Sequence, residues 1–233
     1  MKAMSKAIRS MFDEVSPTYE LVNHTITFGL DTVWRRLAAV FAARKGGAVW
    51  VDVCSGTGEM ALSLRHFAAT HTRVIGVDFS TPMLKKAASK SEAGGVLFML
   101  ADVKTLPLRS SSLDVLTVAF AIRNLHMSKR ALVGTLEEFH RVLKPDGLFI
   151  SLETSQPSSK LIRWLFRSYV KWLVKTIGRT ISSSSSAYSY LSSTVLRFYG
   201  AEDFAEIIRE AGFSRIRFYS MMSGIVAIHE ARK

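Results

Sequence analysis

One stretch decides how this chain folds, and it reads Val49-Trp50-Val51-Asp52-Val53-Cys54-Ser55-Gly56-Thr57-Gly58-Glu59. A short apolar run ends in an acidic residue, a glycine-rich turn follows, and a helix-compatible segment begins at Met60. Glycines at positions 56 and 58 let the backbone turn tightly and approach a ligand without an intervening Cβ. The stretch therefore predicts a nucleotide-bearing cofactor at the carboxyl end of the first strand of a parallel sheet.

The glycine turn alone does not identify that cofactor. Residues Gly56 to Ala61 also fit the G-x-G-x-x-A form of a dinucleotide fingerprint, with Asp78 near the position of a ribose-binding acid. A glycine-rich turn that holds no ligand is a further alternative. The remainder of the chain has to separate these interpretations.

Length and composition bound the class of protein. The 233 residues suffice for one α/β domain with a sizeable core, and 48% hydrophobic with 21% charged residues is ordinary for a soluble globular protein. One cysteine excludes a disulfide framework and a cysteine-rich metal site, and it fits a reducing compartment. No secretory signal or membrane-spanning run is found, so the sequence predicts a cytoplasmic protein. The net charge of +12 suggests an anionic partner, either nucleic acid or a membrane surface.

Apolar, β-branched runs alternate with helix-like segments. The predicted strands are Ala48–Val53, Arg73–Asp78, Val96–Leu100, Leu113–Phe120, Leu148–Glu153, Arg215–Tyr219 and Gly224–His229. The predicted helices include Gly29–Ala43, Met60–Ala69, Pro82–Ser91, Lys129–Leu143 and Ala201–Ala211. This alternation predicts an α/β fold with a doubly wound, mostly parallel seven-stranded sheet. The last two strands are so close in sequence that they should form an antiparallel hairpin.

Polar residues stand where the predicted strands end. They are Asp52, Asp78, Asp102, Glu153 and the pair Arg123-Asn124. Ligands of open parallel sheets bind outside the carboxyl ends of the strands. Ordinary loop polarity explains each of these residues singly, but a shared site explains the whole set.

Two segments lie outside the strand-helix pattern of what should be a single domain over residues 1–233. Residues 1–45 form a helical N-terminal extension, and residues 154–200 form an insertion without any acidic residue. The insertion includes the serine run Ser182–Ser186, which is typical of a flexible loop.

Further motifs are distributed along the chain. They are Met11-Phe12-Asp13, Tyr19-Glu20, Asn23, Trp34, Leu106-Pro107, Phe120-Ala121-Ile122-Arg123-Asn124, Arg141-Val142-Leu143-Lys144-Pro145-Asp146-Gly147, Leu152-Glu153-Thr154-Ser155-Gln156-Pro157, Ala187-Tyr188-Ser189-Tyr190-Leu191 and Gly224–His229. With the glycine turn, these motifs make the sequence resemble the UbiE-like menaquinone and ubiquinone C-methyltransferases over nearly its whole length. The family's enzymes depend on S-adenosylmethionine and have the class I methyltransferase fold.

The chain departs from the family pattern at several positions. Glu20 stands where the family has aspartate, Ala121-Ile122 where it has Gly-Leu, and Asp146 where it has glycine. Thr154 replaces the phenylalanine expected between Glu153 and Ser155. The motifs expected to bind the cofactor match the family pattern closely, whereas those expected to bind the substrate differ from it more.

The resemblance implies S-adenosylmethionine as methyl donor. By position in the family pattern, the cofactor-binding residues are Asp52, Gly56, Thr57, Gly58, Asp78, Asp102, Val103 and Ala119. Asp52 is placed to meet the ammonium group, Asp78 the two ribose hydroxyls, and Asp102 the adenine amine, with Val103 packing nearby. No pyrophosphate-binding arginine is needed, which agrees with a methyl donor over a dinucleotide.

The resemblance also implies a polyprenylated quinol as methyl acceptor. A quinol ring carbon becomes nucleophilic as the ortho hydroxyl loses its proton, and some group has to take or relay that proton. By resemblance Arg123 and Asn124 act at this deprotonation step. We favour Arg123 as the stabiliser of the oxyanion, because arginine stays protonated. Tyr19 and Tyr188 are further catalytic candidates. No His/Asp/Glu cluster has metal-ligand spacing, so no metal is expected. His126 could be a base, but it departs from the family pattern and a surface-loop histidine is favoured. His229 is interpreted as structural, and the other histidines are interpreted as solvated or capping residues; these are His24, His66, His71 and His140.

The insertion carries the clearest charge pattern. Arg163, Arg167, Lys171 and Lys175 recur every four residues among tryptophans and other bulky apolar side chains, so a helix over Lys160–Ile177 would bear one basic stripe. Such a helix is typical of an interfacial segment, and it predicts peripheral contact with the inner face of the membrane, as a lid and an entry route for the tail. Packing of the apolar face on the core, with a merely solvated stripe, is the alternative.

Three other functions are weighed against quinol methylation. The high isoelectric point suggests a nucleic-acid methyltransferase, but the amphipathic location of the charge and the missing base-flipping signature argue against a nucleic-acid partner. A methyltransferase for a small phenol is a second alternative. A catalytically silent scaffold that binds S-adenosylmethionine or quinone is the third, and a homodimer is compatible with each.

Overall fold

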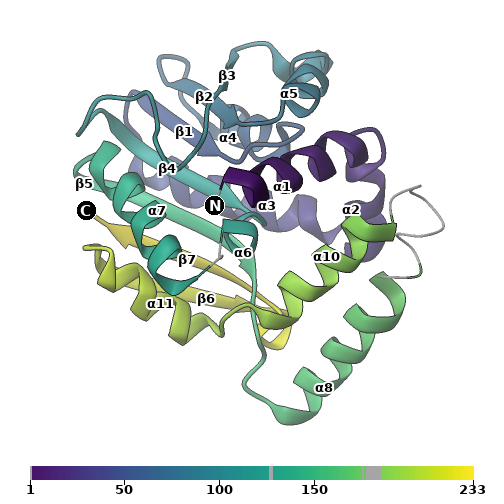
Figure 1. Ribbon diagram of the computed structural model, residues 1–233. Coiled ribbons are helices and arrows are strands. Elements are labelled where there is room, and N and C mark those ends of the chain that lie inside the picture. The colour runs from purple at the N-terminus through teal and green to yellow at the C-terminus, as the bar shows by residue number, and fades with distance from the viewer. Residues whose placement is uncertain (1, 126–127, 175, 177–184) are drawn as a thin grey trace.

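The computed structural model describes residues 2–125, 128–174, 176 and 185–233. Its centre is a seven-stranded sheet with the order β3-β2-β1-β4-β5-β7-β6 (Figure 1). The strands are β1 (Val49–Val53), β2 (Arg73–Asp78), β3 (Val96–Leu100), β4 (Leu113–Ala119), β5 (Leu143–Thr154), β6 (Ser214–Met221) and β7 (Val226–Arg232). Strands β1 to β5 pair in parallel, whereas β7 is antiparallel to both β5 and β6. The predicted α/β fold, sheet and C-terminal hairpin are confirmed.

The hairpin is not added in chain order, because β7 lies between β5 and β6. The side chains explain this arrangement. Val226, Ala227 and Ile228 of β7 are buried, while β6 carries Arg215 and Arg217 and is mostly exposed. An apolar strand belongs inside the sheet, and a charged strand protects its edge from pairing with another chain.

Helices cover both faces of the sheet (Figure 1). They are α1 (Lys2–Val15), α2 (Tyr19–Thr27), α3 (Leu30–Lys45), α4 (Glu59–Phe67), α5 (Thr81–Ala88), α6 (Ile122–Leu125), α7 (Lys129–Val142), α8 (Lys160–Tyr169), α10 (Ser185–Arg197) and α11 (Ala201–Glu210). Short 3-10 turns are η1 (Ser91–Ala93) and η3 (Met222–Gly224), and η2 (Val170–Val174) is a π-helical segment.

Alternate residues of each strand face two separate cores. On one face Val51 and Val53 pack with residues of α7 and α11 such as Phe139 and Phe204. On the other face Trp50 packs with residues of α3 and α4. This period of two is what buries a parallel sheet on both sides.

The inserted segment differs from its prediction. The expected helix over Lys160–Ile177 is helical as α8 only to Tyr169 and continues as the π-helical η2, and Lys175 and Ile177 lie outside the described residues. Ser182–Ser184 of the predicted serine loop also lie outside them, whereas Ser185 and Ser186 begin α10. Helices α8 and α10 pack together through Phe166, Val170 and Val195.

No helix in the described part of the chain is both long enough and apolar enough to cross a lipid bilayer.

Candidate active site

Two cavities lie next to each other at the carboxyl edge of the sheet, and the side chain of Phe120 lines both. The smaller cavity, of about 70 Å³, adjoins the glycine turn. The larger, of about 490 Å³, opens between the N-terminal helices, α8 and the turn between β6 and β7. Phe120, just after β4, adopts a left-handed backbone (φ +55°), which redirects the chain into α6 between the two cavities.

The smaller cavity is built on the predicted glycine turn. Gly56 (φ +55°) and Gly58 (φ +85°) have left-handed backbones, and an alanine Cβ at position 58 would lie 2.9 Å from that of Ala87. Asp78 organises the turn, because one carboxylate oxygen accepts the Gly56 N–H at 2.8 Å and the other accepts the Ser80 N–H at 2.9 Å. Each oxygen keeps a lone pair for a ligand. Burial raises the pKa of Asp78 despite these two donors.

Asp52 ends β1 beneath this turn and is almost fully buried. Thr117 donates a hydrogen bond to its Oδ1 at 2.8 Å, but its Oδ2 has no well-formed hydrogen bond within the described protein. Burial raises the pKa of Asp52 to about 7, against the opposing effect of the Thr117 and Ser55 hydroxyls. A buried carboxylate oxygen that lacks a hydrogen-bond donor suits a cationic ligand group, such as the ammonium of S-adenosylmethionine.

The predicted cofactor residues are not all on the cavity wall. Gly56, Asp78 and Ala119 line the smaller cavity. The other predicted residues, Asp52, Thr57, Gly58, Asp102 and Val103, do not. Asp102 is exposed just after β3 and accepts the Lys104 N–H, while Val103 is buried in the core beside it.

Tyr19 and Asn124, predicted as catalytic, line the smaller cavity rather than the larger. Tyr19 packs edge-on against Phe12 of α1, which covers the same cavity. Asn124 has a buried Oδ1 that accepts no hydrogen bond from the described protein. Tyr188 belongs to α10, but its side chain lies outside the described residues, as does the whole of His126.

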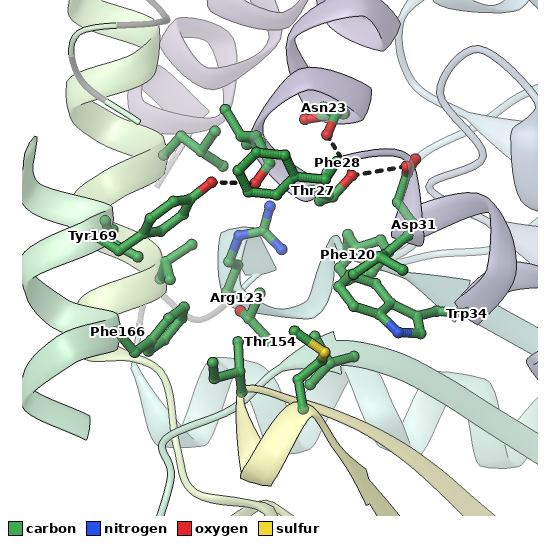
Figure 2. A pocket seen from close by; sticks show the side chains of 18 of the residues that line it. Asn23, Thr27, Phe28, Asp31, Trp34, Phe120, Arg123, Thr154, Phe166 and Tyr169 are labelled. Carbon is green, nitrogen blue, oxygen red and sulfur yellow. Dashed lines mark hydrogen bonds between the residues drawn. The ribbon is translucent and has the colours of Figure 1, made fainter. Parts of the chain in front are cut away.

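Arg123 is on the other side of α6 and lines the larger cavity. Its Nη1 donates to Glu153 Oε1 at 2.5 Å, and its backbone N–H donates to Glu153 Oε2 at 3.3 Å. Both side chains are buried, so the pair is a desolvated ion pair. The Nε of Arg123 has no partner in the described protein, and Figure 2 shows the guanidinium pointing into the cavity.

The walls of the larger cavity are largely apolar. They include Ile26, Phe28, Trp34, Leu165, Phe166, Tyr169, Val170, Leu191, Val195, Met222, Ile225 and Val226 (Figure 2). Leu165, Phe166, Tyr169 and Val170 belong to the segment predicted as a lid, and Trp34, Leu191, Ile225 and Val226 belong to motifs recognised in the sequence. The remaining residues come from segments far apart in the chain, and no motif marks them. Tyr169 donates its hydroxyl to the Ile26 carbonyl, which ties α8 to α2.

An ion network next to the larger cavity corrects the interpretation of His24 as a merely solvated or capping residue. His24 Nδ1 lies 2.8 Å from Asp31 Oδ1, and its Nε2 lies 3.4 Å from Glu59 Oε2. The three groups are close enough to hold a cation. Arg35 pairs with both carboxylates and Lys90 with Glu59, so positive charge already occupies this cluster. The network joins α2 and α3 to the start of α4.

Comparison with known proteins decides which family this geometry represents. The model of the ubiE/COQ5 methyltransferase family matches residues 1–233. The chain belongs to this family. The UbiE C-methyltransferase of Syntrophotalea carbinolica is 36% identical over 225 residues, which cover 95% of this chain and 92% of that one. The demethylmenaquinone methyltransferase of Thermus thermophilus is also 36% identical, over 94% of this chain and 98% of its own.

Solved structures of other methyltransferases show which fold the chain has. A Thermotoga maritima S-adenosylmethionine-dependent methyltransferase, described as a possible histamine N-methyltransferase, aligns with a TM-score of 0.63 at 20% identity, over 96% of this chain and 99% of its own. A similar enzyme of Aquifex aeolicus aligns with a TM-score of 0.56 at 17% identity, over 80% and 82%. The fold is that of the class I methyltransferases, as predicted.

Proposed function

We propose that this protein transfers the methyl group of S-adenosylmethionine to a ring carbon of a polyprenylated quinol. One observation carries the proposal: the Arg123 guanidinium, paired with buried Glu153, points into a large apolar cavity directly beside the glycine-turn cavity (Figure 2). An apolar volume of about 490 Å³ suits a ring with a hydrocarbon tail. The guanidinium gives the ring one polar anchor, which fits a hydroxyl oxygen.

The residues around the glycine turn suit S-adenosylmethionine, which supplies an electrophilic methyl group when bound. Asp52 would meet the ammonium through its unpaired Oδ2, and the backbone of Gly56, Thr57 and Gly58 would lie along the methionine part. Asp78 would accept the ribose hydroxyls on its remaining lone pairs. By the family pattern, Asp102 and Val103 would receive the adenine, and Ala119 would close the pocket.

Arg123 and Asn124 would act on the acceptor from opposite sides of α6. Arg123 would hold the quinol oxygen and stabilise the negative charge that develops on it, inside an apolar cavity where such charge is poorly solvated. Asn124, on the cofactor side, would help to align donor and acceptor, and Tyr19 on the same wall would shape that contact. The catalytic gain is mainly positioning and electrostatics.

Radiolabelled S-adenosylmethionine with demethylmenaquinol, and separately with the demethylated benzoquinol, in liposomes tests the proposal. Methylation of one ring, lost in Arg123→Ala but with the cofactor still bound by calorimetry, is the expected result. Arg123→Lys is the matched variant, because it keeps a cation beside Glu153. Cofactor binding without methylation of either quinol would refute the proposal and favour another phenol or a scaffold. Salt-sensitive binding of RNA would instead favour a nucleic-acid substrate.

The mouth of the larger cavity supports peripheral membrane contact. Three lining residues from different segments are exposed there: Phe28 (77%), Leu165 (53%) and Met222 (52%). Phe28 and Met222 hold these positions on left-handed backbones (φ +54° and +48°), which bulky residues seldom adopt. Two further exposed aromatic residues, Trp164 and Trp172, belong to α8 and η2, the segments that contribute Leu165 and Val170 to the cavity. A tail in this cavity would leave it through an apolar rim, and a rim of this kind fits the acyl boundary of a bilayer.

The basic stripe differs from its prediction in detail. Arg163 donates to the carbonyls of Pro157 and Ser158, and Arg167 donates to that of Leu196. Two of the four predicted headgroup ligands are therefore engaged within the protein, and the tryptophans and rim residues supply most of the proposed contact.

Vesicle flotation tests the membrane proposal. The triple variant Phe28→Asn, Leu165→Gln, Met222→Asn removes the rim, and asparagine tolerates the left-handed backbone. Leu97→Gln on β3 is the matched control, because Leu97 is equally exposed (56%) but lies away from both cavities. Loss of flotation on anionic vesicles in the triple variant alone is expected. Unchanged flotation of the triple variant would refute membrane contact at this rim.

A further inference from the structure

Glu153, which the sequence analysis gave no chemical role, is buried behind two residues that line the larger cavity, Arg123 and Thr154. Its carboxylate is 1% exposed and accepts four hydrogen bonds. Two come from Arg123, as described, and two from Thr154: the backbone N–H at 2.7 Å and the hydroxyl at 3.0 Å, both to Oε1. Arg123 Nη1 and Thr154 Oγ1 therefore share one carboxylate oxygen.

Thr154 also lines the cavity, beside Arg123 (Figure 2). Its hydroxyl gives its proton to Glu153 and keeps lone pairs for a donor in the cavity. An acceptor oxygen held by Arg123 would lie within reach of this hydroxyl, because both groups are fixed on the same carboxylate oxygen. Such an oxygen carries the proton that has to leave during methylation.

The other polar residues of the cavity are less suited to receive that proton. The Tyr169 hydroxyl is committed to the Ile26 carbonyl. Thr27 also donates to a carboxylate, Asp31 Oδ1, at 2.8 Å, but that carboxylate pairs with Arg35 and His24 and not with Arg123. Thr27 therefore provides a natural comparison for Thr154.

We propose that Thr154 and Glu153 form the proton relay of the methyl transfer, an inference that rests on the proposed function. As the ring carbon attacks the sulfonium methyl, a C–C bond forms and the S–CH₃ bond breaks, which leaves S-adenosylhomocysteine. The substrate hydroxyl gives its proton to Thr154 Oγ1, whose own proton passes to Glu153. The methylated ring then loses the proton on its tetrahedral carbon to water. Glu153 returns its proton through Thr154 to the oxygen, so one proton is released for each methyl transferred.

This relay conserves the charge of a desolvated site. Before transfer the guanidinium of Arg123 faces the Glu153 carboxylate, and as the proton leaves it faces the partial negative charge on the substrate oxygen. The sulfonium loses its positive charge when the methyl leaves and Glu153 loses its negative charge when it takes the proton, so the net charge of donor, acceptor, Arg123 and Glu153 is unchanged. The substrate hydroxyl becomes more acidic as the carbon attacks, because its C–O bond gains carbonyl character, and a carboxylate then accepts its proton readily. Deprotonation of arginine, which keeps its proton to beyond about pH 12, is not needed.

Three variants test the relay. Thr154→Val removes the hydroxyl at nearly constant volume, Thr154→Ser keeps it, and Thr27→Val removes the comparison hydroxyl. At neutral pH we expect Thr154→Val to lower kcat about 10²-fold with little change in KM, the usual size of a general-base contribution. Thr154→Ser should stay within a few-fold of the wild-type kcat, and Thr27→Val should lower kcat less than Thr154→Val does.

The pH profile separates a relay from a merely structural role. Phenols ionise near pH ~10, so the substrate needs less help as the pH rises. The ratio of wild-type to Thr154→Val kcat should therefore fall toward one in alkaline buffer, whereas a structural defect would keep it constant. Equal kcat in wild type and Thr154→Val, or a ratio independent of pH, would overturn the relay while leaving quinol methylation intact. A wild-type protein that methylates no quinol would overturn the proposed function and the relay with it.

Discussion

Replacing Asp52 with asparagine should stabilise the ligand-free protein and weaken its hold on the cofactor. The carboxylate is buried, and its pKa is raised from 3.8 to about 7. A raised folded pKa means that the unfolded chain binds fewer protons between these values, so stability falls as the pH rises from about 4 through about 7. The shift of about three units corresponds to about 4 kcal/mol lost by pH 8. An unpaired amide N–H₂ in the variant would cost about 1–3 kcal/mol, which leaves a net gain of about 1–3 kcal/mol.

Urea unfolding of both proteins at pH 5 and pH 8 measures this difference. The gain should be present at pH 8 and absent or reversed at pH 5, where the wild-type Asp52 is protonated. Calorimetry with S-adenosylmethionine should show weaker binding to the variant at pH 8, because the ammonium loses its anionic partner. A variant that is less stable than the wild type at pH 8 would refute the burial argument. Unchanged cofactor affinity would refute the assignment of Asp52 to the ammonium.

Three further outcomes are expected. Arg123→Ala should lower the free energy of unfolding in urea by about 3–5 kcal/mol, because it leaves Glu153 as an unpaired buried charge. The double variant Arg123→Met, Glu153→Gln should lower it less, because no charge is left behind. A double variant that is as unstable as the sum of the two single changes would contradict this. Gly58→Ala should lower Tm more than Gly29→Ala, because both positions have positive φ but only the first meets a neighbour, at 2.9 Å; equal losses would show that backbone strain alone matters. Burial lowers the pKa of His229 to about 4. The stability contributed by neutral His229 should therefore be lost as the pH falls from about 6.5 to 4, by up to about 3 kcal/mol. His229→Phe should reduce this acid-side loss of unfolding free energy, and an unchanged loss would assign it to other groups.

The sheet and its ligand edge were predictable because they depend on local patterns. Apolar, β-branched runs predicted the strands, and the carboxyl ends of these strands placed Asp52 and Asp78 at one edge by topology alone. Family membership and the class I fold are confirmed. The residues' roles in catalysis and cofactor binding, the domain organisation and the membrane contact stay predictions.

The segment Lys160–Ile177 was predicted to cover a ring-binding pocket, and four of its residues line the larger cavity, but the rest of the wall was not predictable because it is a product of packing between distant segments. Phe28 and Met222 meet at its mouth although nearly the whole chain separates them, and neither has a sequence signal of its own. The basic stripe shows what periodicity leaves out, because spacing alone does not say which side chains bond within the protein. Arg163 donates to the nearby Pro157 carbonyl and Arg167 to the Leu196 carbonyl of α10. The membrane contact of the stripe stays a prediction.

Three buried atoms around the two cavities connect the fold to the chemistry. Asp52 Oδ2, Asn124 Oδ1 and Arg123 Nε each find no hydrogen-bond partner in the described protein. A buried polar atom in this condition costs about 1–3 kcal/mol, so the three together weaken the ligand-free fold by several kcal/mol. Asp52 and Asn124 lie on the cofactor side of α6 and Arg123 on the acceptor side. Under the proposed function, a donor would satisfy the first two and an acceptor the third, so the full free energy would be recovered only with both bound across α6, which is the arrangement that methyl transfer requires.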